Sequence, residues 1–142
     1  MSTIIDATGH VLGRMATNVA KLALSGEEVH IVNAEKAIII GASKKSIEAR
    51  YTFKREVGTH RKGPFFPREP HLIVKRTIRG MLPYQKPDGR AALRRVIAHI
   101  GVPKELEGQE TIQLKDALRD GRSFMTIQEL SAYLGAHDKM EA

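Results

Sequence analysis

A glycine-containing turn near the N-terminus is the first place where the sequence could carry chemistry. Residues 9–14 (G-H-V-L-G-R) follow a short apolar run and precede a run with helical spacing. Turns of this kind bind phosphates and dinucleotides through the N–H groups at the start of the helix. The spacing matches neither G-x-G-x-x-G nor G-x-x-x-x-G-K-S/T, so we expect a tight structural turn here. A nucleotide-binding or RNA-modifying enzyme that uses this turn is the alternative.

Other reactive side chains are scattered along the chain. The six histidines lie at positions 10, 30, 60, 71, 99 and 137, no two share a helical turn, and none has the neighbour that a zinc motif needs. The chain contains no cysteine and no G-x-S-x-G elbow for a nucleophilic serine. Asp6 alone makes no acid–base pair, and we expect it to bind backbone N–H groups where the first strand turns. We therefore expect no metal, no cofactor, no small-molecule substrate and no enzymatic activity.

Positive charge is concentrated in the middle of the chain. The 142 residues carry a net charge of +7, yet residues 44–95 hold 15 basic and 4 acidic side chains, a net +11. Residues 1–43 and 96–142 are acidic, at −1 and −3. A block of this density repels itself unless a polyanion neutralises it, which predicts an anionic partner. The alternative is a solvated basic face.

Aromatic residues share this basic segment. Five of the seven in the chain lie within it, namely Tyr51, Phe53, Phe65, Phe66 and Tyr84. Flat side chains stack on splayed bases while cations bind phosphates, so the segment predicts nucleic-acid binding. Core packing is the commoner role of each ring taken singly, and Phe65 and Phe66, flanked by prolines in a loop, are the exceptions. No helix-turn-helix, zinc finger or dimerising heptad supports the alternative of a DNA-binding protein.

Neither a membrane span nor a membrane-surface helix is indicated. The longest purely apolar run is residues 37–40, and no stretch pairs a basic face with a clean apolar one. The N-terminus lacks the basic patch and apolar stretch of a signal peptide. Length and composition suit one globular domain over residues 1–142. We expect a cytoplasmic protein.

Hydrophobic spacing predicts the elements that position these residues. Strands are expected at residues 3–7, 29–33, 37–40 and 97–100, and helices at 11–25, 43–57, 72–81 and 91–96. Residues 58–70, with two glycines and three prolines, predict an extended loop, and residues 87–89 (P-D-G) predict a turn. Ser43 is expected to cap the helix at 43–57. Thr126, with Glu129 at capping-box spacing, begins a last helix that ends at Gly135. The alternation of strands and helices along the chain favours an α/β sandwich with a mainly parallel sheet.

Four motifs in order give the chain a resemblance to a known family. They are I-I-D-A-T-G-H-V-L-G-R-M-A at 4–16, I-V-N-A-E-K-A at 31–37, R-T-I-R-G-M-L-P at 76–83 with its continuation to 93, and I-G-V-P at 100–103. Together they resemble large-subunit ribosomal protein L-thirteen (universal family). The stretch K-G-P-F-F-P-R at 62–68 resembles its archaeal and eukaryotic branch, and the lack of a long basic C-terminal extension favours an archaeal member. His99 stands where the family usually has an aromatic residue, and residues 104–142 match no motif.

The resemblance implies a three-layer α/β/α sandwich around a mainly parallel four-stranded sheet, with an extended basic loop. It implies a structural constituent of the large ribosomal subunit that binds large-subunit rRNA and supports subunit assembly. It also implies neighbouring large-subunit proteins as partners. Finally, it gives the turn at residues 9–14 a structural role, in agreement with the spacing of its glycines.

The basic segment and the matched motifs supply the candidate rRNA-binding residues. Arg76, Arg79 and Arg90 lie in the most distinctive motif, whereas residues 80–83 (G-M-L-P) are expected to shape the chain. Arg14 matches the family, and closing the first turn is its alternative role. The full set is Arg14, Lys44, Lys45, Arg50, Lys54, Arg55, His60, Arg61, Lys62, Phe65, Phe66, Arg68, Lys75, Arg76, Arg79, Lys86, Arg90 and Arg94. We expect a less defined C-terminal lobe at residues 104–142.

Overall fold

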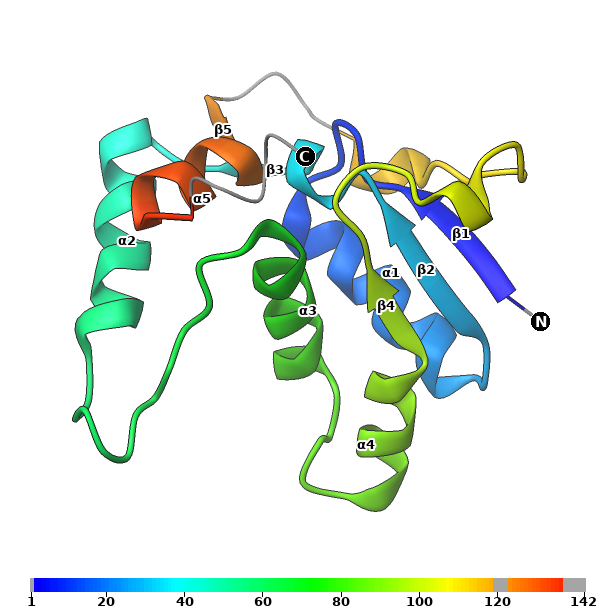
Figure 1. Ribbon diagram of the computed structural model, residues 1–142, viewed down its shortest axis with the longest axis horizontal. Coiled ribbons are helices and arrows are strands. Elements are labelled where there is room, and N and C mark those ends of the chain that lie inside the picture. The colour runs from blue at the N-terminus through cyan, green and yellow to red at the C-terminus, as the bar shows by residue number, and fades with distance from the viewer. Residues whose placement is uncertain (1, 119–122, 137–142) are drawn as a thin grey trace.

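A three-stranded parallel sheet forms one side of the fold, on the right in Figure 1. In the computed structural model, which describes residues 2–118 and 123–136, β1 (Ser2–Asp6), β2 (Glu28–Val32) and β4 (Val96–Ala98) pair in the order β1-β2-β4. Both pairings are parallel. β3 (Ile38–Ile40) and β5 (Phe124–Thr126) form a separate antiparallel pair. The mixed α/β class and the mainly parallel sheet are confirmed, but the expectation of one four-stranded sheet is wrong.

The turn after β2 leads the chain away from the parallel sheet. Asn33 adopts a left-handed φ of 54°, which asparagine tolerates better than most residues, and its amide donates to Asp6 Oδ1 at 3.2 Å. A 3₁₀ turn at Ala34–Lys36 then redirects the backbone. The N–H of Ile38 donates to the carbonyl of His10 at 2.8 Å. β3 therefore pairs with a strand from far along the chain and not with its sequence neighbour β2.

Helices α1 (Leu12–Leu24), α3 (Pro70–Met81) and α4 (Pro87–Arg94) pack together beside the parallel sheet. The helical spacing of Met15 and Val19 places both on the buried side of α1. They join Ile78 of α3 and Ile31 of β2 in the main apolar cluster. Apolar burial of this kind is the dominant favourable term in folding, so this cluster holds the helices on the sheet.

The other face of the parallel sheet is partly open. It carries His30 and Ile97, which are register partners, and Ile97 is 36% exposed, so the expected second helical layer does not cover it. His30 stacks on His99, with ring centroids 5.5 Å apart and planes 8° from parallel. The imidazole of His99 therefore supplies a flat packing surface where the family usually has an aromatic ring.

A segment from the C-terminal part of the chain closes the outer edge of β1. The N–H of Ile112 donates to the carbonyl of Ile4 at 2.8 Å, and the carbonyl of Ile112 accepts from the N–H of Asp6 at 3.2 Å. Ile112 thereby extends the parallel pairing by one residue beyond β1. Further 3₁₀ turns lie at Lys104–Leu106 and Lys115–Ala117. Residues 119–122 and 137–142 of the expected C-terminal lobe, which include His137, lie outside the described residues.

Two helix caps that the sequence predicts are confirmed. α2 (Lys44–Glu56) begins after Ser43, whose hydroxyl accepts from the N–H of Ser46 at 3.2 Å. α5 (Ile127–Leu134) begins after Thr126, whose hydroxyl accepts from the N–H of Glu129 at 3.1 Å. It ends at Gly135, whose φ of 105° suits glycine at a helix C-terminus. None of the helices in the described residues is long and apolar enough to span a bilayer.

The expected turn at residues 87–89 is instead the first turn of α4. Pro87 occupies the first helical position, where its missing N–H removes no hydrogen bond. Gly89 is buried, and a Cβ there would lie 2.0 Å from the carbonyl oxygen of Pro83. A glycine that serves close packing inside a helix therefore looks, in sequence, like a glycine that serves a turn.

His10 attaches the C-terminal segment to the core. Its side chain is fully buried, and Nε2 accepts from the N–H of Leu114 at 2.9 Å. This bond requires an unprotonated Nε2, and burial lowers the pKa of the imidazole, outweighing the nearby carbonyl groups and Asp6, which raise it. The folded state therefore favours the neutral form of the His10 imidazole.

We expect the protein to lose stability as pH falls because His10 must then protonate. The folded state holds the pKa of His10 below its ordinary value of 6.5, so the unfolded chain binds more protons below that pH. The free energy of unfolding should therefore decrease from about pH 7.5 to about pH 5. Urea unfolding of the wild type and of His10→Gln, which keeps an acceptor but does not titrate, measures this.

The slope of stability against pH should be shallower for His10→Gln than for the wild type. His99 is a second site at which the same effect is expected, because burial and the neighbouring His30 also lower the pKa of its imidazole. His99→Gln should remove a separate part of the slope. A slope that His10→Gln leaves unchanged would contradict the assignment.

Candidate nucleic-acid interface

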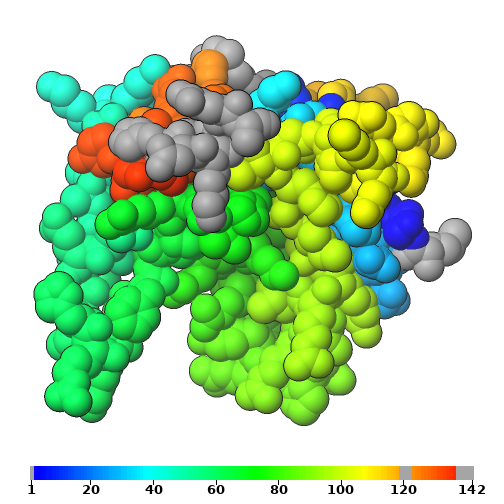
Figure 2. Space-filling view, viewed as in Figure 1, coloured from blue at the N-terminus to red at the C-terminus, as the bar shows by residue number. Residues whose placement is uncertain are grey.

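The basic segment builds two projections from the body of the protein. One consists of α2 and the segment that follows it, residues 57–69, and we call residues 57–69 the basic loop. The other consists of the end of α3, the turn at residues 82–86, and α4. Figure 2 shows a deep hollow between the green and yellow-green projections. Candidate residues lie on both sides of this hollow.

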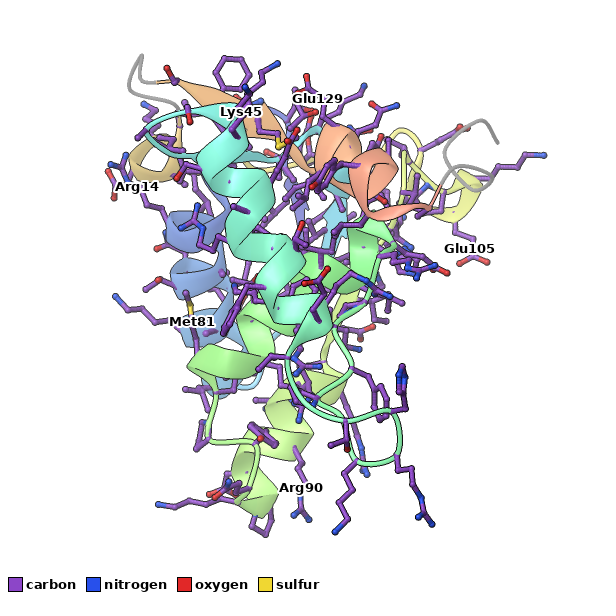
Figure 3. All side chains as sticks on the ribbon, turned by 90° about the vertical axis from the view of Figure 1, so that its left-hand side faces the viewer. Arg14, Lys45, Met81, Arg90, Glu105 and Glu129 are labelled. Atoms are coloured by element: carbon purple, nitrogen blue, oxygen red, sulfur yellow. The ribbon has the colours of Figure 1, made fainter. Side chains whose placement is uncertain are left out.

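The candidate residues spread along the molecule and do not form one cluster. Figure 3 places Lys45 near one end and Arg90 at the other, with Arg14 at the side. None of the candidates is buried. The exposed ones are Arg14, Lys44, Lys45, Arg50, Lys54, His60, Arg61, Lys62, Phe65, Arg68, Lys86, Arg90 and Arg94. The half-buried ones are Arg55, Phe66, Lys75, Arg76 and Arg79.

Two arginines hold the basic loop by its backbone. The guanidinium of Arg55, from α2, donates to the carbonyl of Phe66, and that of Arg76, from α3, donates to the carbonyl of Phe65 at 3.1 Å. The Phe66 ring meets the buried Tyr51 edge-on, with centroids 5.6 Å apart, and packs against the core. Of the two rings that the sequence singles out for bases, Phe66 is thus an anchor, while Phe65 is 64% exposed.

Three positively charged side chains lie close to the Tyr51 and Phe66 rings. Lys54 Nζ lies 4.5 Å from the Tyr51 centroid, and the guanidinium carbons of Arg50 and Arg76 lie within 6 Å of the Tyr51 and Phe66 centroids, at 5.8 and 5.9 Å. Burial, aided by the positive charges of Arg50 and Arg76, lowers the pKa of Lys54. Within residues 2–118 and 123–136, none of these three side chains pairs with a carboxylate. An anion placed here would relieve their repulsion.

The second projection is shaped by two of the motif arginines. The guanidinium carbon of Arg79 lies 4.2 Å from the centroid of the Tyr84 ring. Arg90 Nε donates to the carbonyl of Tyr84 at 3.0 Å, and its Nη2 donates to that of Gln85 at 3.4 Å. Both arginines therefore stabilise the turn at residues 82–86, which presents Lys86 to solvent.

A groove of about 500 Å³ lies between α2, the basic loop and α3. Its lining residues are Tyr51, Phe53, Lys54, Val57, Pro64, Phe66, Arg76, Thr77, Gly80 and Met81. Sequence reasoning did not select Phe53, Gly80 or Met81 as binding residues. The signal for Phe53 was present, because two residues along a helix from the buried Tyr51 is a rotation of about 200°, away from the core. Phe53 is accordingly 67% exposed.

The first half of the turn at residues 9–14 forms hydrogen bonds within the protein. The N–H groups of Gly9, His10 and Val11 donate to carbonyl groups of the protein at 3.2, 3.0 and 2.6 Å. Asp6 Oδ1 accepts from the N–H of Thr8 at 3.0 Å, as the sequence predicts. These three N–H groups are therefore occupied within the fold and are not available to a phosphate. Among the described residues, no three His, Asp or Glu side chains are placed to hold a metal ion.

Comparison with known proteins places the chain among ribosomal proteins. Residues 1–105 match the family model described as "Ribosomal protein L13". The "Large ribosomal subunit protein uL13" of Archaeoglobus fulgidus is 47% identical over 137 residues, which cover 94% of this chain and 87% of that protein. The proteins of the same description from Sulfolobus acidocaldarius and Methanocaldococcus jannaschii are each 47% identical and cover 93% and 94% of this chain, and 92% and 98% of their own lengths.

The chain belongs to the ribosomal protein L13 family, which comprises ribosomal structural proteins and not enzymes. The resemblance seen in the four motifs is confirmed, and the named relatives are archaeal, as expected. Their similarity also extends well past residue 105, where the family model ends. Much of the C-terminal segment without motifs is therefore shared with archaeal relatives.

We expect Arg76→Ala to loosen the basic loop without unfolding the protein. The variant loses a charge-assisted hydrogen bond to Phe65 and the contact of Arg76 with the Phe66 ring, about 1 kcal/mol of local stability. Deuterium uptake by backbone amides of residues 57–69 should become about fivefold faster. Arg79→Ala is the control, since the guanidinium of Arg79 lies over the Tyr84 ring, outside the basic loop. Equal uptake in both variants would contradict the anchoring role.

Proposed function

We propose that this protein is a structural constituent of the large ribosomal subunit in the cytoplasm. It binds large-subunit rRNA through the basic face of residues 44–95, supports assembly of the subunit, and lies beside neighbouring large-subunit proteins. Membership of the ribosomal protein L13 family and the description of the relatives as large-subunit proteins support this proposal.

The observation that carries the proposal is the lack of acidic partners for the basic face. Lys44 pairs with Glu129 at 3.1 Å. Within residues 2–118 and 123–136, the other lysines and arginines of the segment 44–95 form no ion pair with a carboxylate. No carboxylate among the described residues therefore neutralises these charges, which leaves them available to phosphates.

The two kinds of cation have different tasks on RNA. An arginine fork binds a phosphate bidentately and fixes its orientation, whereas a lysine acts as a point charge. Arg61 and Lys62 project from the tip of the basic loop and are exposed, so they can reach RNA away from the body of the protein. Because side chains cannot read the deep groove of A-form RNA, specificity comes from the shape of the RNA and from splayed bases.

We expect the affinity for deproteinised archaeal large-subunit rRNA to fall steeply with salt. If about six phosphates are neutralised, a plot of log K against log salt should have a slope of about −4 to −5. Arg61→Gln/Lys62→Gln, which removes two charges from the loop tip, should make the slope shallower by about 1.5. Filter binding over a series of potassium chloride concentrations measures both slopes.

The matched control removes two exposed cations outside the basic segment. Lys21→Gln/Lys104→Gln has the same change in net charge and lies in the acidic flanks. Its slope should equal that of the wild type. If both double variants change the slope equally, net charge and not the basic face determines binding, and the proposed face is wrong.

A further inference from the structure

Gly80 has no structural reason to be glycine in the folded protein. It lies in the last turn of α3, and glycine is among the weakest helix formers. Its φ is an ordinary one for a side-chain-bearing residue, and a Cβ built on it would meet no atom within 4 Å. Gly89, in contrast, cannot accept a Cβ because the Pro83 carbonyl lies against it. A glycine at an open position leaves room for another molecule to approach the backbone closely, and Gly80, unlike Gly13 of α1, borders a groove.

Gly80 lies in the wall of the groove described above, and the groove is lined by exposed apolar side chains. Phe53 is 67% exposed, Val57 is 40% exposed and Met81 is 42% exposed. Figure 3 shows Met81 at the edge of the molecule, beside α1 and away from the other labelled residues. Apolar side chains gathered in one groove indicate a ligand with a flat or apolar part. The volume of about 500 Å³ lies within the range of small-ligand sites, about 300–1,000 Å³.

The charges in the groove define the other part of the ligand. Lys54 and Arg76 line the groove, and Arg50 stands beside them against the Tyr51 ring. As described above, none of the three pairs with a carboxylate among the described residues. Cations beside apolar walls suit a ligand that combines an anion with a flat hydrophobic group.

We propose that this groove holds one unstacked nucleotide of the bound RNA. Its base lies against the apolar lining residues Phe53, Gly80 and Met81, and its phosphate lies on Lys54 and Arg76. The inference rests on the proposed rRNA binding and adds a specific subsite to it. A segment of a neighbouring protein is the other conceivable occupant. An ordinary apolar peptide would leave Lys54 and Arg76 without an anion, so the charges favour the nucleotide.

The test fills the groove without changing any charge. Gly80→Leu places an apolar side chain where the base would lie, and leucine is a better helix former than glycine, so thermal unfolding should occur at the same or a higher temperature. Gly13→Leu is the matched control, because Gly13 is also an exposed helical glycine with open space around it and does not line the groove. Both variants are compared with the wild type on deproteinised archaeal large-subunit rRNA.

Gly80→Leu should weaken binding by about 5- to 150-fold, as expected for the loss of one stacked base. The salt slope should become shallower by no more than about 1, the contribution of one phosphate. Gly13→Leu should bind within twofold of the wild type, well below the loss of one stacked base. Chemical probing of the rRNA bases should reveal one nucleotide that the wild type and Gly13→Leu protect and that Gly80→Leu leaves reactive.

Two results would overturn the subsite and leave the basic face intact. One is wild-type affinity for Gly80→Leu; the other is weaker binding with no change in the protection of any base, which assigns the groove to a contact other than a base. Failure of the wild type to bind rRNA with a steep salt slope would instead overturn the proposed function, and the subsite with it.

Discussion

Hydrogen bonds from two guanidinium groups to the backbone of the basic loop are the interactions on which the candidate interface depends. A loop with two glycines and two prolines forms few bonds of its own, and its ordering costs conformational entropy. Arg55 and Arg76 hold it from opposite helices, and the Phe66 ring seals the contact against Tyr51. The loop cations are thereby preorganised, so less entropy is lost when an anion binds.

The motif arginines consequently have two tasks. Arg76 supports the basic loop and lines the groove, while Arg79 and Arg90 support the turn at residues 82–86. A guanidinium carries five N–H donors, so a bond to one or two carbonyls leaves others for phosphate oxygens. Lysine could supply the charge but not this combination, because its single ammonium group cannot span a carbonyl and a phosphate in fixed directions.

Local signals in the sequence were sufficient for the elements that depend on neighbours along the chain. The caps at Ser43 and Thr126, the end of α5 at Gly135 and the turn made by Asp6 all follow from short-range hydrogen bonds, and all are confirmed. The sheet was predicted less well, because β5 is only three residues long and forms by pairing with β3. The roles of Gly89 and Gly80 could not be predicted from the sequence either. That of Gly89 depends on the carbonyl of Pro83 in the preceding turn, and that of Gly80 depends on the open space around it.

The two hydrogen bonds between Ile112 and β1 have a consequence for the protein when it is free in solution. An open strand edge is a template on which another chain can add a strand, and free copies of a β-containing protein aggregate in this way. Ile112 occupies the N–H of Asp6 and the carbonyl of Ile4, and at the other edge of the sheet β4 is only three residues long. The segment that carries no recognisable motif therefore blocks part of the strand edge on which another chain could otherwise pair.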